Sequence, residues 1–273
     1  MRGEGCGLKA ERVQVRRERP TAAAWTVAMA VTMLFVYVLT LGAARPVAVE
    51  SVSAAPRVTR EIRLRALKMY CVSLGSWPDA GNARIEAAGF VSRGAAGFVR
   101  EVDGVWHVLG AMYGDQRDAR RVAKRLTESG EARAEVLCLE AGAVTLRVTA
   151  PERQIGAIAA ADEKIREQID RLGGVALQLD RKQIRPDEAR TLCALACTEA
   201  DEASKALDGV PSSAGNELCA SLIADLQALA GQLDDITKSP QASAAALSGM
   251  LRLTQIDAFM RLRELQSALV SGG

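Results

Sequence analysis

Leu74-Gly75-Ser76-Trp77 begins a pattern that continues with Ala83-Arg84 and Gly94. The pattern returns as Leu109-Gly110-Ala111-Met112, followed by Ala119-Arg120 and Gly130, and the interval from alanine to glycine is 11 residues in both copies. Because both copies keep the same order of apolar, small and glycine positions, the chain contains one structural unit written twice. The two copies lie within residues 66–140 and decide the fold of that part of the chain.

Each copy predicts a strand, a helix and a second strand. A short apolar segment rich in aromatic and β-branched residues, 69–77 or 105–113, indicates the first strand. Small and apolar residues then recur at helical spacing, as at Ala83, Ala87 and Phe90, which predicts a helix with one buried stripe. Further strands are expected at 96–102 and 132–139. Between the copies, Asp103-Gly104 is a strong signal for a tight hairpin turn.

The resulting order, β-α-β-β-α-β, is typical of the ferredoxin-like arrangement. In that arrangement both helices cover one face of a four-stranded antiparallel sheet. The other face is expected to be open, and an open sheet face is a binding platform. The fold class predicted here is therefore α+β.

The residues of these strands resemble the SPOR (sporulation-related repeat) domain. The resemblance rests on residues 70–77 (Tyr-Cys-Val-Ser-Leu-Gly-Ser-Trp), Asn82-Ala83, residues 106–113 (Trp-His-Val-Leu-Gly-Ala-Met-Tyr), Ala119 and Leu126. It covers about seventy residues, and we place the SPOR-like domain at 66–145. The resemblance implies binding of peptidoglycan, especially glycan strands stripped of their stem peptides, in a bacterial division or sporulation protein.

Alternation along the strands selects the candidate glycan contacts. Cys71 and Ser73 share one face of the first strand, whereas Val72 and Leu74 share the other with Tyr70. The larger apolar set is expected to face the helices, which leaves Cys71 and Ser73 on the open face. The predicted glycan-binding residues are Ser73, Trp106, Arg100 and Cys71.

Two of these positions depart from the family pattern. Ser73 stands where the family often has a glutamine, and Trp106-His107 where a tyrosine and a basic residue are usual. A serine side chain has less hydrogen-bonding reach than a glutamine. Whether glycan binding survives is therefore left open.

The range Thr21 to Ala44 contains no charged residue and is long enough to span about 30 Å of hydrocarbon. The segment before it, 1–20, carries six basic residues against three acidic ones. By the positive-inside rule this basic tail is cytoplasmic, and the rest of the chain lies outside the cell membrane. A cleaved signal peptide is the alternative, although its apolar region is usually shorter.

Two further segments follow from composition and periodicity. Residues 45–65 contain prolines, small residues and arginines and are predicted to be a linker. Residues 151–273 carry apolar residues at spacings of three and four, as in 155–179 and 219–236, which predicts about four helices in an antiparallel bundle. Expected breaks lie at Gly173-Gly174, Arg185-Pro186, 211–213 and Ser239-Pro240. The bundle is expected to be a packed domain that could present one groove to a protein partner.

The sequence gives little sign of catalysis, metal binding or nucleic-acid binding. The single histidine, His107, lies in a predicted strand without a nucleophile motif, and no phosphate loop or metalloprotease signature occurs. The formal net charge of +2 is too low for a nucleic-acid-binding footprint. We therefore expect no enzymatic activity, no cofactor and no metal. Five of the six cysteines follow the apolar span, and a disulfide between Cys71 and Cys138 is conceivable.

These observations predict a single-pass membrane protein of the bacterial cell envelope that binds peptidoglycan glycan strands through a SPOR-like domain. The alternative is a membrane-tethered scaffold for protein contacts, in which the same fold has lost its glycan. The sequence does not distinguish division from sporulation, and it identifies neither the oligomeric state nor the partner of the helical domain.

Overall fold

The computed structural model describes residues 56–210, 216–239 and 242–271. Pro56–Gly273 forms one compact unit of class α+β, as the sequence predicts. Its elements are β1 (Arg57–Leu64), β2 (Leu67–Trp77), α2 (Ala80–Val91), β3 (Phe98–Val102), β4 (Val105–Tyr113), α3 (Gln116–Glu128), β5 (Glu135–Ala141), β6 (Val144–Pro151), α4 (Glu152–Asp180), α5 (Pro186–Asp208), α6 (Glu217–Thr237) and α7 (Ala244–Ser271).

The duplicated stretch forms a four-stranded antiparallel sheet in the order β3-β4-β2-β5. Helix α2 connects β2 to β3, and α3 connects β4 to β5. The predicted hairpin turn is confirmed: Val102 pairs with Val105, and the φ angles of Asp103 and Gly104 are +52° and +79°. Both turn residues are left-handed, as a two-residue hairpin of type I′ requires.

The repeated alanines and glycines have matching roles in the two copies. Ala83 of α2 and Ala119 of α3 are fully buried against the sheet. Gly94 and Gly130 follow these helices with φ angles of +90° and +72°. Only glycine adopts this backbone readily, so it reverses the chain after each helix without strain.

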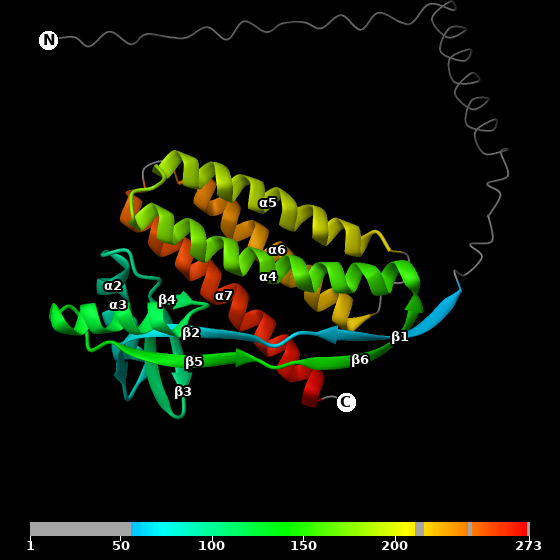
Figure 1. Cartoon of the computed structure of the whole chain (residues 1–273), viewed down its shortest axis with the longest axis horizontal. Coiled ribbons are helices and arrows are strands. Elements are labelled where there is room, and N and C mark those ends of the chain that lie inside the picture. The colour runs from blue at the N-terminus through cyan, green and yellow to red at the C-terminus, as the bar shows by residue number, and fades with distance from the viewer. Residues whose placement is uncertain (1–55, 211–215, 240–241, 272–273) are drawn as a thin grey trace, which may run out of the picture. The chain divides into compact units, whose positions relative to one another are not determined.

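Strand β1 corrects the predicted linker. Residues 57–64 do not connect two domains but pair with β6, from Arg57 opposite Pro151 to Leu64 opposite Val144. The reason is an alternation within the arginine-rich stretch, since Ile62 and Leu64 are buried while the intervening Arg63 is exposed. As β1 leads directly into β2, and β5 into β6, the strands make one long ribbon (Figure 1).

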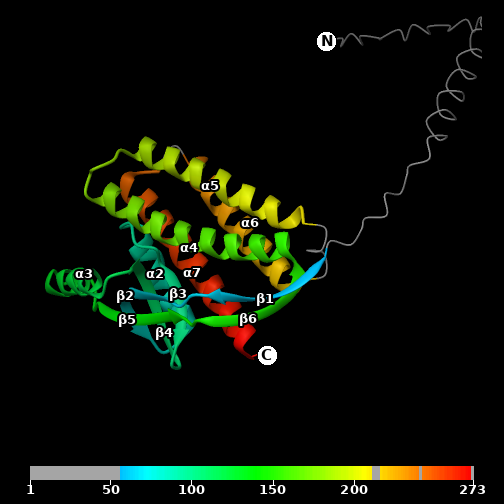
Figure 2. The same ribbon diagram turned by 45° about the vertical axis from the view of Figure 1, so that its right-hand side comes forward.

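Helices α4 to α7 form the predicted bundle, and successive helices run in alternating directions (Figures 1 and 2). The expected break at Gly173-Gly174 is wrong, because α4 is continuous through both glycines. The buried stripe simply carries on through Val175, Ala176 and Leu179. A Cβ atom at position 173 would lie 2.4 Å from Nε2 of Gln255, so the glycine leaves room for this buried side chain of α7.

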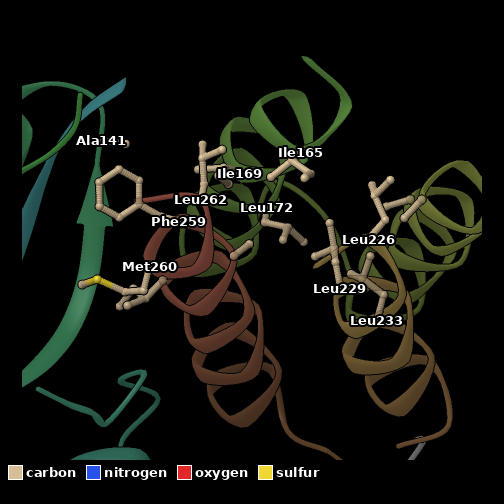
Figure 3. Packing of buried hydrophobic residues seen from close by; sticks show 14 of the residues in the cluster. Ala141, Ile165, Ile169, Leu172, Leu226, Leu229, Leu233, Phe259, Met260 and Leu262 are labelled. Atoms are coloured by element: carbon tan, nitrogen blue, oxygen red, sulfur yellow. The ribbon is translucent and has the colours of Figure 1, made fainter. Parts of the chain in front are cut away.

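The main core joins the sheet to the bundle. Figure 3 shows Phe259 on α7 directed toward the strands, with Ile165, Ile169 and Leu172 of α4 nearby and α6 on the far side. The same buried cluster includes Met69, Leu109 and Met112 of the sheet. A second, smaller cluster lies between the sheet and helices α2 and α3.

The predicted span Thr21 to Ala44 lies outside the described residues, as do the basic tail 1–20 and residues 45–55. Among the helices that the structure describes, none is long and apolar enough to cross a membrane.

Candidate functional site

The sheet face that was expected to be open is covered by α7, so this expectation is wrong. Helix α7 contacts β3, β4, β5 and β6 and crosses the strands in Figures 1 and 2. Beneath it, the side chains of Met69, Cys71, Leu109 and Met112 are at most 3% exposed. The sequence contains the reason. Strands β2 and β4 carry apolar residues on both of their sides, and such strands are normally buried on both faces.

Ser73 lies on the covered face and is fully buried. Its hydroxyl donates a hydrogen bond to the carbonyl of Gly75 at 3.0 Å, and its oxygen lies 3.1 Å from Nδ1 of His107. Since the single hydroxyl hydrogen goes to Gly75, we infer that the imidazole Nδ1–H donates to the serine oxygen. Ser73 is thus satisfied within the sheet.

His107 adds a third member to this cluster, since its Nδ1 also lies 3.3 Å from Oε1 of Glu135. A serine hydrolase needs the serine on one imidazole nitrogen and the acid on the other, so that the base is oriented while it takes the proton. Here both groups contact the same nitrogen. The cluster holds β2, β4 and β5 together and lacks the geometry of a catalytic relay.

Arg100 lies beside this cluster, because it pairs with His107 across β3 and β4. Its Nη1 is 3.0 Å from Oε1 of Glu264 on α7, and its side chain is 25% exposed. The guanidinium therefore connects the sheet edge to the helix that covers it.

Trp106 is separated from the other predicted contacts. It pairs with Trp77 across β4 and β2, and both indoles pack on the side of the sheet that faces α2 and α3. The structure therefore brings Ser73 and Arg100 to one cluster, buries Cys71 beneath α7 and places Trp106 on the opposite face. The four predicted residues do not form one surface.

The cysteines do not form the conceivable disulfide. Cys71 and Cys138 are both free, and Cys138 pairs with Tyr70 rather than with Cys71. Because side chains alternate along a strand, the two thiols point to opposite faces. Burial raises the pKa of the Cys71 thiol to about 12, with a smaller contribution from Cys138. In the part of the chain that the structure describes, no three histidine, cysteine or acidic side chains are grouped to hold a metal.

Sequence reasoning missed the role of Glu135 and the hollows beside α3. Glu135 lies inside the predicted strand 132–139, and only the register of β5 against β2 brings it opposite Ser73. Hollows lie next to α3, where Arg121 and Arg125 line a cleft. The density of basic residues in 117–125 was the available signal.

Comparisons with protein-family models, with curated proteins and with solved structures find no match to this chain.

Proposed function

We propose that this chain is a membrane-tethered scaffold of the bacterial cell envelope. In its SPOR-like module, helix α7 of the same chain covers the sheet face where a ligand would bind. The strand order β3-β4-β2-β5, with α2 and α3 as the two connections, supports a ferredoxin-like module. Tethering rests on the uncharged range Thr21 to Ala44 and on the basic tail before it.

The observation that carries the proposal is the packing of α7. Phe259, Leu262 and Met260 belong to the same buried cluster as Met69, Cys71 and Leu109 of the sheet. Fully burying one such side chain is worth about 1.5–3 kcal/mol, so the helix is held by several such contributions. A glycan strand would have to displace all of them to reach the centre of this face.

A second candidate function is glycan binding at the uncovered corner of the same face. There the carboxylate of Glu135 is 52% exposed, and the side chain of Arg100 retains some access to solvent. Hydroxyl groups of a sugar could hydrogen bond to both groups. This second candidate function is the peptidoglycan binding predicted from the sequence, at a site smaller than the open sheet face expected there.

Sedimentation with cell-wall sacculi separates the two functions. The full chain in non-ionic detergent is mixed with intact sacculi and with sacculi stripped of stem peptides by an amidase. A scaffold should stay in the supernatant in both cases. Glycan binding predicts pelleting that increases after amidase treatment and falls in Glu135→Lys but not in Glu140→Lys, a matched exposed glutamate on β5.

The scaffold role also requires a protein contact. Leu195 on α5 is a large apolar side chain of the bundle that is 53% exposed. A photo-crosslinking residue at this position should give a discrete protein adduct in cells. The same residue at the exposed Glu202 on α5 is the control. Identical adducts or none at both positions would argue against a partner on this helix.

A further inference from the structure

A groove lies between α2 and α3, over the sheet face opposite the one that the middle of α7 covers, and Arg252 of α7 lines one end of it. Its floor consists of Val72, Leu74 and Ala111, and its walls carry Phe90 of α2 with Val122 and Leu126 of α3. The volume of this part is about 210 Å³. The floor is buried and the α3 wall is half-buried. We call this hollow the inter-helix groove.

Two further hollows share lining residues with the groove, one at each end. At one end a hollow of about 520 Å³ shares Leu74, Phe90 and Ala132 with it and reaches Trp77. At the other end a cleft of about 270 Å³ shares Val122, Asp180 and Arg252 with it. The three hollows therefore adjoin one another, with the inter-helix groove in the middle.

The cleft at the second end is rich in arginine. Its lining includes Arg121 and Arg125 of α3, Arg181 after α4 and Arg252 of α7. Arg252 pairs with Asp180, and Arg121 lies 3.3 Å from Asp118. Arg125 and Arg181 are exposed and form no ion pair with any described residue. An anion would therefore find two uncommitted guanidinium groups here.

We propose that this site binds one anionic phospholipid molecule, with an acyl chain in the inter-helix groove and the phosphate at Arg121, Arg125 and Arg181. Guanidinium groups bind phosphate bidentately and are weakly hydrated, which suits this headgroup. The apolar side chains gather in the inter-helix groove, whose lining also includes Arg93 and Glu131, and the arginines gather in the adjoining cleft.

This inference does not depend on the scaffold role, since the apolar floor of the groove belongs to the core cluster between the sheet and α2 and α3, not to the cluster beneath α7. It does place the lipid on a module that the proposed anchor would hold near a membrane. The failure of either proposal therefore leaves the other standing.

Photolabelling of the full chain in non-ionic detergent tests the proposal. The probe is dodecyl phosphate with a diazirine in its alkyl chain, and the labelled peptides are identified by mass spectrometry. Label is expected in 80–95 and 116–134. The double variant Arg121→Glu/Arg125→Glu should reduce this label by at least about tenfold, because each arginine contributes to binding an anionic headgroup.

The matched control is Arg117→Glu/Arg120→Glu, which reverses two exposed charges on the same helix outside the cleft. It should label like the native chain, and circular dichroism should show that both variants are folded. Label restricted to 21–44, equal labelling of the two double variants, or equal labelling by the uncharged dodecanol analogue would overturn the proposal. Competition by inorganic phosphate as strong as that by dodecyl phosphate would also overturn it, because the apolar chain would then contribute nothing.

Discussion

Ser73 shows how one short side chain fits the covered part of a sheet face. Its hydroxyl bonds to Gly75 and lies beside His107, so no polar atom of the side chain needs water. A longer polar side chain at this position would have to enter the layer between sheet and α7. The residue is thus suited to a buried site rather than to a binding surface.

Substitution of Ser73 measures how closed this face is. Ser73→Ala should lower the free energy of unfolding by about 1 kcal/mol, the typical value of one hydrogen bond. Ser73→Glu should lower the free energy of unfolding by several kcal/mol, because the substitution would bury an ionised carboxylate without a dedicated cationic partner. Urea unfolding followed by tryptophan fluorescence gives both values. Equal stability of the two variants would mean that the face opens readily.

Asp225 on α6 couples stability to pH. Burial raises its pKa from 3.8 to about 6; Arg261 opposes the shift, and Asp257 and Glu264 add to it. The folded state favours the protonated form of Asp225. The stability that Asp225 contributes is therefore present below pH 3.8 and is lost as the pH rises through about 6.

At pH 8, the free energy of unfolding of Asp225→Asn should therefore exceed that of the native chain by about 2 kcal/mol. Near pH 4 the two free energies should be equal. Thermal or urea unfolding at the two pH values checks this difference. Asp235→Asn, an exposed position on the same helix, is the control and should show no such pH-dependent gain. A native chain that is as stable as the variant at pH 8 would contradict the prediction.

Helix α7 is the element that decides the accessibility of the sheet. It has two buried sides, one against the strands and one against α4 and α6. A helix that is buried on two sides belongs to the core of a domain rather than to its surface. This packing makes the sheet and the bundle parts of one structure.

Truncation of Phe259 tests this packing. Phe259→Ala should cost about 3–5 kcal/mol, because it leaves a cavity between sheet and bundle. Leu253→Ala, at a 41% exposed position of α7, should change stability by only about 0.5 kcal/mol. Tryptophan fluorescence reports the sheet and far-ultraviolet circular dichroism reports the helices. Both signals should shift together in Phe259→Ala, whereas a shift of the helical signal alone would mean that the two parts unfold separately.

At the scale of the whole molecule, the strands and helices from Pro56 onward depend on one another. The ribbon of β1 and β6 continues the central sheet strands, and α4 begins directly where β6 ends. The sheet segment by itself lacks the helix that covers its apolar face. Its isolation therefore exposes a surface that is internal in the complete chain.

A fragment of residues 60–145 should accordingly bind the dye ANS strongly and self-associate. It exposes Met69, Leu109 and Met112, which α7 covers in the complete unit. A fragment of residues 56–273 should bind little dye at the same concentration. Dye fluorescence and sedimentation velocity provide the comparison. A monomeric 60–145 fragment with low dye binding would show that the sheet module is complete without the bundle.

Much of the local structure could be predicted from the sequence, because it depends on neighbouring residues. The repeat predicted both strand-helix-strand copies, Asp103-Gly104 predicted the turn, and the heptad-like spacing predicted the four long helices. The linker prediction failed at β1 because strand partners lie far away in the sequence. The prediction of a break at Gly173-Gly174 failed because a glycine pair was taken as a helix end, although Gly173 lies inside α4 and leaves room for the side chain of Gln255 on α7.

The candidate site was predicted less well than the fold. Residues 71 and 73 were correctly assigned to one face of β2, but the occupant of that face comes from a helix nearly two hundred residues later in the chain. By itself, the sequence determined which residues form each element and which side chains share a face, since hydrogen bonding and periodicity are local. Only the tertiary structure decided which face is closed, because burial of apolar surface depends on which distant element packs there.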